Sequence, residues 1–68
     1  MGVCEVRKNS GLSFIGKDEG IGIALFEGDI WLYKQDEKHQ DRIKVLHGSD
    51  ICISIKGEKF CELFRVVK

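Results

Sequence analysis

The sequence predicts a small all-β domain, a barrel or sandwich of SH3-like size with about five to seven short antiparallel strands. Three observations lead to this prediction. Short runs of β-branched and aromatic residues recur along the chain, and clusters rich in Gly, Asp, Asn or Ser separate them. Two of these clusters, Gly28-Asp29 and Gly57-Glu58, have the form of tight hairpin turns. The length of 68 residues fits one domain, so residues 1–68 are assigned to a single unit.

The expected strands follow one another along the whole chain. Each is an apolar run bounded by turn residues, and the segments are 3–6, 12–15, 21–26, 30–34, 43–46, 51–55 and 60–67. A glycine-rich loop over 16–20 joins the second strand to the third. The polar run 35–41 is the longest break between strands.

The segment around Gly28-Asp29 predicts a hairpin that is apolar on both faces. With a two-residue turn at this position, Phe26 lies opposite Trp31 and Ala24 lies opposite Tyr33. Neighbouring residues of a strand point to opposite sides, so these four side chains share one face. Either the other strands cover that face, which places its aromatic residues in the core, or the face is a docking surface.

The last segment admits two interpretations. With a turn at Gly57-Glu58, the sequence predicts a second hairpin in which Ile55 lies opposite Phe60. The spacing of Phe60, Leu63, Phe64 and Val67 is also that of one helical face, which predicts a short C-terminal helix. The strand is favoured because no Ser, Thr, Asp or Asn stands where a helix needs its N-terminal cap.

Composition predicts a cytoplasmic protein without a membrane segment. Charges or glycines interrupt every hydrophobic run before it reaches the ~18 residues that a membrane-spanning helix needs. The cysteines, Cys4, Cys52 and Cys61, are odd in number, and the N-terminal residues do not resemble a secretory signal. A disulfide-stapled secreted domain is therefore not expected.

No pattern in the sequence predicts catalysis, a metal site or a cofactor. His47-Gly48-Ser49-Asp50 combines the residue types of a serine triad, but adjacent residues of a tight turn do not converge as a triad must. The cysteines and histidines lack the close spacing of zinc ligands. The glycine-rich run 16–22 lacks the Gly-Lys-Ser/Thr ending of a phosphate loop. The expected protein is not an enzyme.

The leading functional hypothesis is a protein-binding module, such as a small inhibitor, adaptor or regulatory subunit. Trp and Tyr are enriched at interface hot spots, so the aromatic face supplies the expected anchors, Phe26, Trp31 and Tyr33. Acidic residues surround these anchors in the sequence and form the expected rim: Glu27, Asp29, Asp36 and Glu37. The partner is another protein or, as a homodimer, a second copy of the chain.

The alternative hypothesis is a nucleic-acid-binding β-barrel. The net charge is zero, but acids dominate the middle of the chain and bases dominate both ends. The basic ends provide the expected phosphate contacts: Arg7, Lys8, Lys56, Lys59, Arg65 and Lys68. The aromatic residues lie in the acidic middle, which weakens this alternative because phosphate attraction dominates such binding.

Overall fold

The all-β prediction is confirmed by the computed structural model, which describes the backbone of residues 1–15 and 20–68 and the side chains of residues 1–12 and 22–68. The elements are β1 (Gly2–Val6), β2 (Ser10–Ile15), β3 (Gly20–Leu25), β4 (Ile30–Gln35), β5 (Arg42–His47), β6 (Ile51–Lys56), α1 (Gly57–Leu63) and β7 (Phe64–Val67). The first six expected strands correspond to β1–β6. Residues 16–19 of the expected glycine-rich loop lie outside the described residues.

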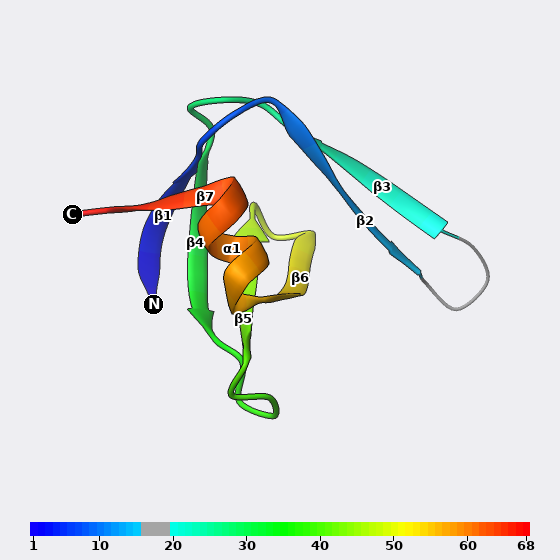
Figure 1. The fold of residues 1–68 in the computed structure, drawn as a ribbon, viewed down its shortest axis with the longest axis vertical. Coiled ribbons are helices and arrows are strands. Elements are labelled where there is room, and N and C mark those ends of the chain that lie inside the picture. Colours follow the sequence, from blue (N-terminus) through cyan, green and yellow to red (C-terminus); the bar gives the residue numbers. More distant parts are fainter. Residues whose placement is uncertain (16–19) are drawn as a thin grey trace.

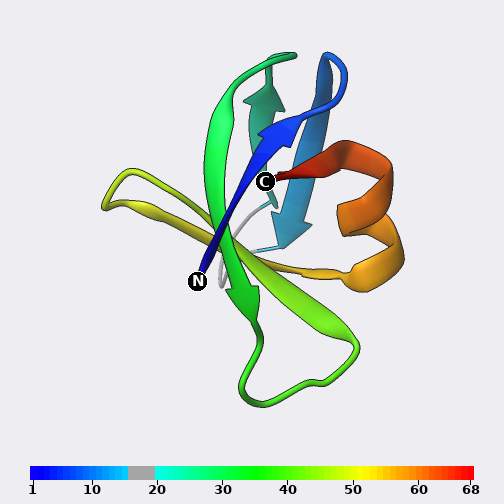
Figure 2. The same ribbon diagram turned by 90° about the vertical axis from the view of Figure 1, so that its left-hand side faces the viewer.

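The strands form two antiparallel sheets in a sandwich-like arrangement. The larger sheet has the order β6-β5-β4-β1-β7, and the smaller consists of β2 and β3. Because β1 pairs with both β4 and β7, strands from the two ends of the chain lie side by side (Figure 1). The β2–β3 hairpin leaves the larger sheet after β1, and the chain returns to that sheet at β4 (Figures 1 and 2).

The core is formed by the inner face of the larger sheet together with residues of β2, β3 and α1. Its buried side chains are Cys4, Val6, Leu12, Leu25, Trp31, Val45, Ile53, Ile55, Phe60, Leu63 and Phe64. Aromatic rings occupy its centre, where Phe64 stacks on Phe60 at 5.6 Å and meets Trp31 edge to face at 5.6 Å. Such pairs add to the free energy gained by burying their surface.

The expected hairpin around Gly28-Asp29 is wrong in its pairing. β3 pairs with β2, whereas β4 pairs with β1 and β5, so Phe26 does not face Trp31. Residues 26–29 form a corner instead, with Gly28 at a φ of 90°. Two backbone hydrogen bonds tie this corner to the end of β1: Gly28 N donates to Val6 O, and Val6 N donates to Asp29 O. The turn itself is centred on Glu27-Gly28, one residue earlier than expected, with Asp29 N donating to Phe26 O (3.0 Å), and it connects two sheets.

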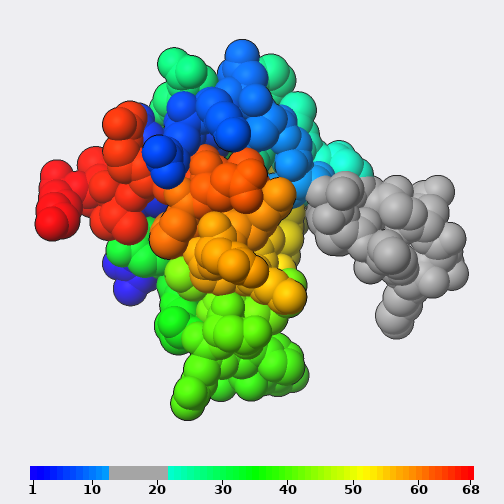
Figure 3. All heavy atoms as spheres, viewed as in Figure 1, coloured from blue at the N-terminus to red at the C-terminus, as the bar shows by residue number. Residues whose placement is uncertain are grey.

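The strand favoured for residues 60–67 is also wrong over its first half. Residues 57–63 form α1 and residues 64–67 form a strand, so the helical alternative is confirmed for Phe60 and Leu63 but wrong for Phe64 and Val67. No side chain caps the start of α1, but Phe60 and Leu63 are both buried, and this burial outweighs the missing cap. At the other end of the helix, Arg7 Nη1 donates to Cys61 O (2.7 Å). Figure 3 shows the C-terminal segment, orange to red, packed between the N-terminal residues and the loop after β4.

Candidate functional site

The three expected anchors do not share one exposed face. Trp31 is only 3% exposed, and its ring contacts Phe64 within the core. Tyr33 is half-buried and its ring lies 5.2 Å from that of Phe60. Phe26 is 60% exposed, but it lies at the corner before β4. Of the two arrangements that the sequence allowed, Trp31 and Tyr33 therefore follow the one in which other elements cover them.

The expected acidic rim is divided between the two ends of β4. Glu27 and Asp29 lie in the corner that precedes this strand, whereas Asp36 and Glu37 lie in the loop that follows it. Asp36 is buried, with 6% of its surface exposed. Glu37 is exposed and lies 3.4 Å from the amino groups of both Lys34 and Lys44, which hold its pKa below the ordinary value. These acids do not form a continuous rim.

The Asp36 carboxylate organises the loop 36–41. Ser54 Oγ donates to Asp36 Oδ2 (2.7 Å), and the backbone N–H groups of Lys38 and His39 donate to Asp36 Oδ1. Arg42 Nε donates in turn to Ser54 Oγ (3.0 Å). These hydrogen bonds, led by that of Ser54, lower the pKa of Asp36 to about 2. A carboxylate with three donors is structural, so Asp36 is not free to contact a partner.

A continuous apolar row crosses the outer face of the larger sheet, the face opposite the core. The strand register places Val3 beside both Val67 and Leu32, and Leu46 beside Leu32. The edge strand β6 adds Cys52, the register partner of Leu46. Register partners lie on the same face of a sheet. We call Val67, Val3, Leu32, Leu46 and Cys52 the outer row.

Four residues of the outer row are exposed to solvent, and the fifth, Leu46, is half-buried. Val3 is 39% exposed, and Leu32 and Val67 are each 42% exposed. Cys4, Trp31, Val45 and Ile53 alternate with the row along β1, β4, β5 and β6, and all four are buried, so the row points away from the core on these strands; Val66, which precedes Val67 on β7, is 44% exposed. The usual exposed face of an antiparallel sheet is polar, so an apolar row across all five strands is unusual.

Charged residues border the outer row on both sides. Arg65 Nε donates to Glu5 Oε1 (2.9 Å) on one side, and Ile30, also exposed, is the register partner of Glu5. On the other side lie Lys34 and Lys44. An apolar centre with a charged border is the usual composition of a protein–protein interface.

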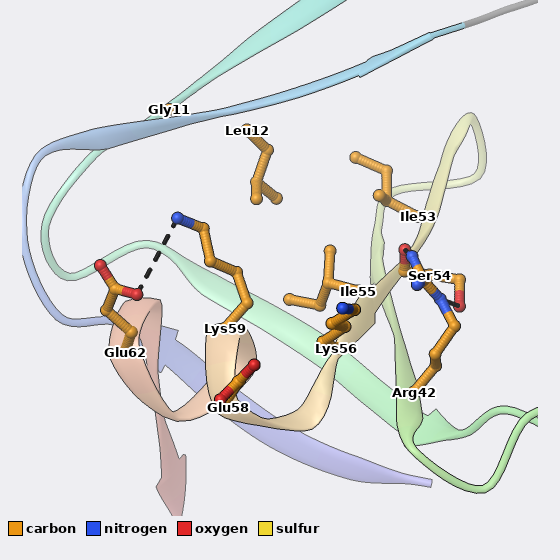
Figure 4. A pocket seen from close by; sticks show the side chains of 10 residues that line it. All are labelled: Gly11, Leu12, Arg42, Ile53, Ser54, Ile55, Lys56, Glu58, Lys59 and Glu62. Atoms are coloured by element: carbon orange, nitrogen blue, oxygen red, sulfur yellow. Dashed lines mark hydrogen bonds and ion pairs between the residues drawn. The ribbon is translucent and has the colours of Figure 1, made fainter.

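A groove beside the edge strand β6 is the second candidate site (Figure 4). Its volume is about 470 Å³, and β6 contributes four consecutive residues, 53–56, to its lining. Leu12 from β2, together with Ile53 and Ile55, provides its apolar surface. Charged side chains complete the lining, Arg42 from β5, Lys56 from β6, and Glu58, Lys59 and Glu62 from α1.

The basic residues of the nucleic-acid hypothesis are dispersed over the molecule. Arg7 bonds to the end of α1, and Arg65 bonds to Glu5 on the outer face. Lys59 lies 3.9 Å from Glu62 beside the groove. Three of the six expected phosphate contacts therefore have partners within the chain, and for Lys59 and Arg65 the partner is a carboxylate that offsets the positive charge.

The residues considered for a serine triad and for a zinc site do not converge on one site. The structure forms a turn at residues 48–50, with Gly48 at a φ of 64° and Ser49 Oγ donating to Asp50 Oδ1. The His47 ring instead lies against Trp31, with the ring centroids 4.8 Å apart and the planes tilted by 38°. Within the described residues, no three His, Cys, Asp or Glu side chains lie close enough to hold a metal ion. Also within these residues, no helix has the length and apolar character needed to cross a membrane.

In comparisons with known proteins, no family model matches this sequence, and no curated protein or solved structure is significantly similar to it.

Reasoning from the sequence missed both candidate surfaces. The outer row combines residues of five strands, and its members Val3 and Val67 are separated by nearly the whole chain. The signal available was the alternation within β1, where Val3 stands between residues that point to the other face. That alternation identifies the face of one strand, but the neighbours of β1 follow only from the pairing of the whole sheet.

Proposed function

We propose that this protein is a non-enzymatic protein-binding module and that it binds its partner through the outer face of the larger sheet. The observation that carries the proposal is the outer row, an exposed apolar row with charged residues on both sides. Such a surface loses solvent-exposed apolar area when a partner covers it, and this drives association. A module of this kind acts as an inhibitor, adaptor or regulatory subunit by occupying a partner's surface.

The partner is expected to place apolar side chains on the outer row. Leu32 lies on β4, at the centre of the larger sheet, and has the row residues Val3 and Leu46 as its neighbours. Side chains at the centre of an interface usually contribute most to affinity, because the surrounding contacts exclude water from them. Leu32 is therefore the residue whose change tests the proposal most directly.

The test compares partner capture by the wild-type protein and two variants. Leu32→Glu introduces a charge in the outer row, and Phe26→Glu introduces the same charge at the exposed corner. Immobilised proteins are incubated with extract of the native host, with and without nuclease treatment, and captured proteins are quantified by mass spectrometry. We expect Leu32→Glu to lose a partner that wild type and Phe26→Glu retain, with all three showing the same circular dichroism spectrum.

Two results would contradict the proposal. Loss of the partner in Phe26→Glu alone would place the binding surface at the corner, and equal capture by all three proteins would show that the outer row is not used. Capture that disappears with nuclease treatment would favour the nucleic-acid alternative. Sedimentation equilibrium of the wild type and Leu32→Glu determines whether the partner is a second copy of the chain.

A further inference from the structure

The groove beside β6 presents different chemistry on its two sides. Ile53 and Ile55 point toward the core and, with Leu12, form an apolar hollow. Ser54 and Lys56 alternate with them along β6 and therefore point to the outer side. Arg42, the register partner of Lys56, lies on that same side. An extended chain in this groove meets an apolar surface on one side and cations on the other (Figure 4).

The edge of β6 is open to an additional strand. β6 is the terminal strand of the larger sheet and, in the described part of the chain, pairs only with β5. Arg42 Nη2 donates to Ser54 O (2.6 Å), so in the described part of the chain this backbone carbonyl of β6 is bonded by a side chain and not by a neighbouring strand. Open edges bind extended peptide segments in many recognition domains, with alternate side chains entering pockets.

The larger sheet contains two pairs of cations that lie opposite each other on adjacent strands. The two pairs differ in whether a carboxylate lies beside them. Lys34 and Lys44 are register partners, and the Glu37 carboxylate lies 3.4 Å from both amino groups. Arg42 and Lys56 are also register partners, but among the described residues no carboxylate makes an ion pair with either of them. Like charges directly opposite each other in a sheet are destabilising. An anion beside Arg42 and Lys56 relieves this repulsion, as Glu37 does for the other pair.

The acidic residues of the groove lie on its helix side. Glu62 pairs with Lys59 (3.9 Å), and Glu58 belongs to the first turn of α1. Asp36 is near the other side, but Ser54 stands between its carboxylate and Arg42. The position for a ligand carboxylate is therefore on the sheet side, between Arg42 and Lys56.

We propose that the groove binds an extended segment of a partner protein in which acidic and apolar residues alternate. An acidic side chain of the segment contacts Arg42 and Lys56, and the apolar side chains on either side of it enter the hollow of Leu12, Ile53 and Ile55. The period of two along an extended chain matches the alternation of the groove. This site is separate from the outer row, so the inference does not depend on the proposed function.

The test measures binding of a fluorescein-labelled peptide with the sequence acetyl-Glu-Leu-Glu-Leu-Glu-Leu-amide by fluorescence polarisation at low salt. We expect saturable binding to the wild-type protein and an affinity about tenfold lower for Lys56→Glu, because the site loses one cation and gains an anion. Lys8→Glu makes the same change of charge at an exposed position outside the groove and should alter the affinity less than about twofold. Backbone amide shifts in the NMR spectrum should concentrate at residues 53–56.

Several results would overturn the proposal. These are the absence of saturable binding up to millimolar protein, equal binding of a peptide with Lys in place of Glu, or equal losses in Lys56→Glu and Lys8→Glu. Displacement of the peptide by a short oligothymidylate that binds more tightly would assign the site to nucleic acid. Leu32→Glu should bind the peptide as wild type does, so failure of the groove and failure of the outer row are distinguished.

Discussion

Ser54 Oγ donates a 2.7 Å hydrogen bond to the buried carboxylate of Asp36, and this bond joins the loop after β4 to the edge strand β6. The same hydroxyl accepts a hydrogen bond from Arg42 Nε (3.0 Å). Ser54 thus connects Asp36, which fixes the loop, to Arg42, which we place in the peptide groove. The loop and the groove are expected to respond together when this connection is broken.

Replacing Asp36 by Asn should reduce stability and change its dependence on pH. The folded protein holds the pKa of Asp36 at about 2, against an ordinary value of 3.8, chiefly through the Ser54 hydrogen bond. A lowered pKa means that the ionised carboxylate stabilises the fold above about pH 4 and that this contribution is lost as the pH falls toward 2. Urea unfolding between pH 2 and 5 should show a shallower loss of stability in Asp36→Asn than in wild type.

Ser54→Ala removes the hydroxyl that donates to Asp36. Ser49→Ala is its control, because Ser49 is an exposed serine whose hydroxyl bonds to Asp50 within its own turn. Ser54→Ala should raise the pKa of Asp36, while Ser49→Ala should leave it unchanged. Identical acid unfolding curves for wild type, Asp36→Asn and Ser54→Ala would contradict the role assigned to this hydrogen bond.

Gln35→Glu should loosen the loop 36–41. Gln35 Nε2 lies between 2.9 and 3.5 Å from four backbone carbonyl oxygens of the loop and its end, those of Asp36, His39, Gln40 and Arg42. In Gln35→Glu, a carboxylate oxygen replaces the donor Nε2 and has no hydrogen to donate to these four acceptors. We expect a loss of about 1–2 kcal/mol in the free energy of unfolding and faster amide exchange within the loop. Gln40→Glu, a matched change at an exposed position, should stay within about 0.5 kcal/mol of wild type; equal effects of the two would refute the prediction.

Gly2→Ala should disturb the packing of Tyr33. A Cβ atom at Gly2 would lie 2.5 Å from the Tyr33 ring, so the ring must move from its position against Phe60. The atoms it would meet belong to the far end of a half-buried side chain, which limits the cost to about 1–2 kcal/mol. In a double-mutant cycle with Tyr33→Ala, the second substitution should remove most of the effect of Gly2→Ala. Additive effects would show that the contact is not the cause.

The three thiols should differ in reactivity. Cys4 is fully buried, and desolvation raises the pKa of its thiol to about 11, while Cys52 and Cys61 are exposed. At pH 8, Ellman's reagent should label two thiols rapidly and the third only at the rate at which the protein opens. Because the folded pKa of Cys4 is raised, stability should also decline as the pH rises from about 9 to 11. Rapid labelling of all three thiols would contradict the burial of Cys4; Cys4→Ala provides the control.

Much of the fold was accessible from the sequence because it depends on residues that are near one another in the chain. Apolar alternation and turn residues located β1 to β6 within a few residues. Gly28 and Gly48 both adopt positive φ, as their positions in turns suggested. The spacing of Phe60 and Leu63 also fits α1. The missing cap favours a strand at this position, but the burial of these two side chains favours the helix and has the larger effect.

The candidate sites were not accessible in this way. The sequence predicts that the segment containing Phe26, Trp31 and Tyr33 is apolar on both faces, but it leaves open which face the other strands cover. Trp31 and Tyr33 pack into the core or against it, and Leu32 is exposed on the other side. A period of two establishes that alternate residues lie on opposite faces, but not which face is covered.

The sequence by itself determined where β1 to β6 lie, to within a few residues, and which residues of each of these strands share a face. The tertiary structure alone decided that β1 pairs with β4 and β7, that Trp31 is covered, and that Val67, Val3, Leu32 and Leu46 meet in one row. The physical reason is how far apart along the chain the interacting residues are. Turns and alternation are set by neighbouring residues, whereas strand order is set by the arrangement that buries Trp31, Phe60 and Phe64 in one core, which requires the whole chain.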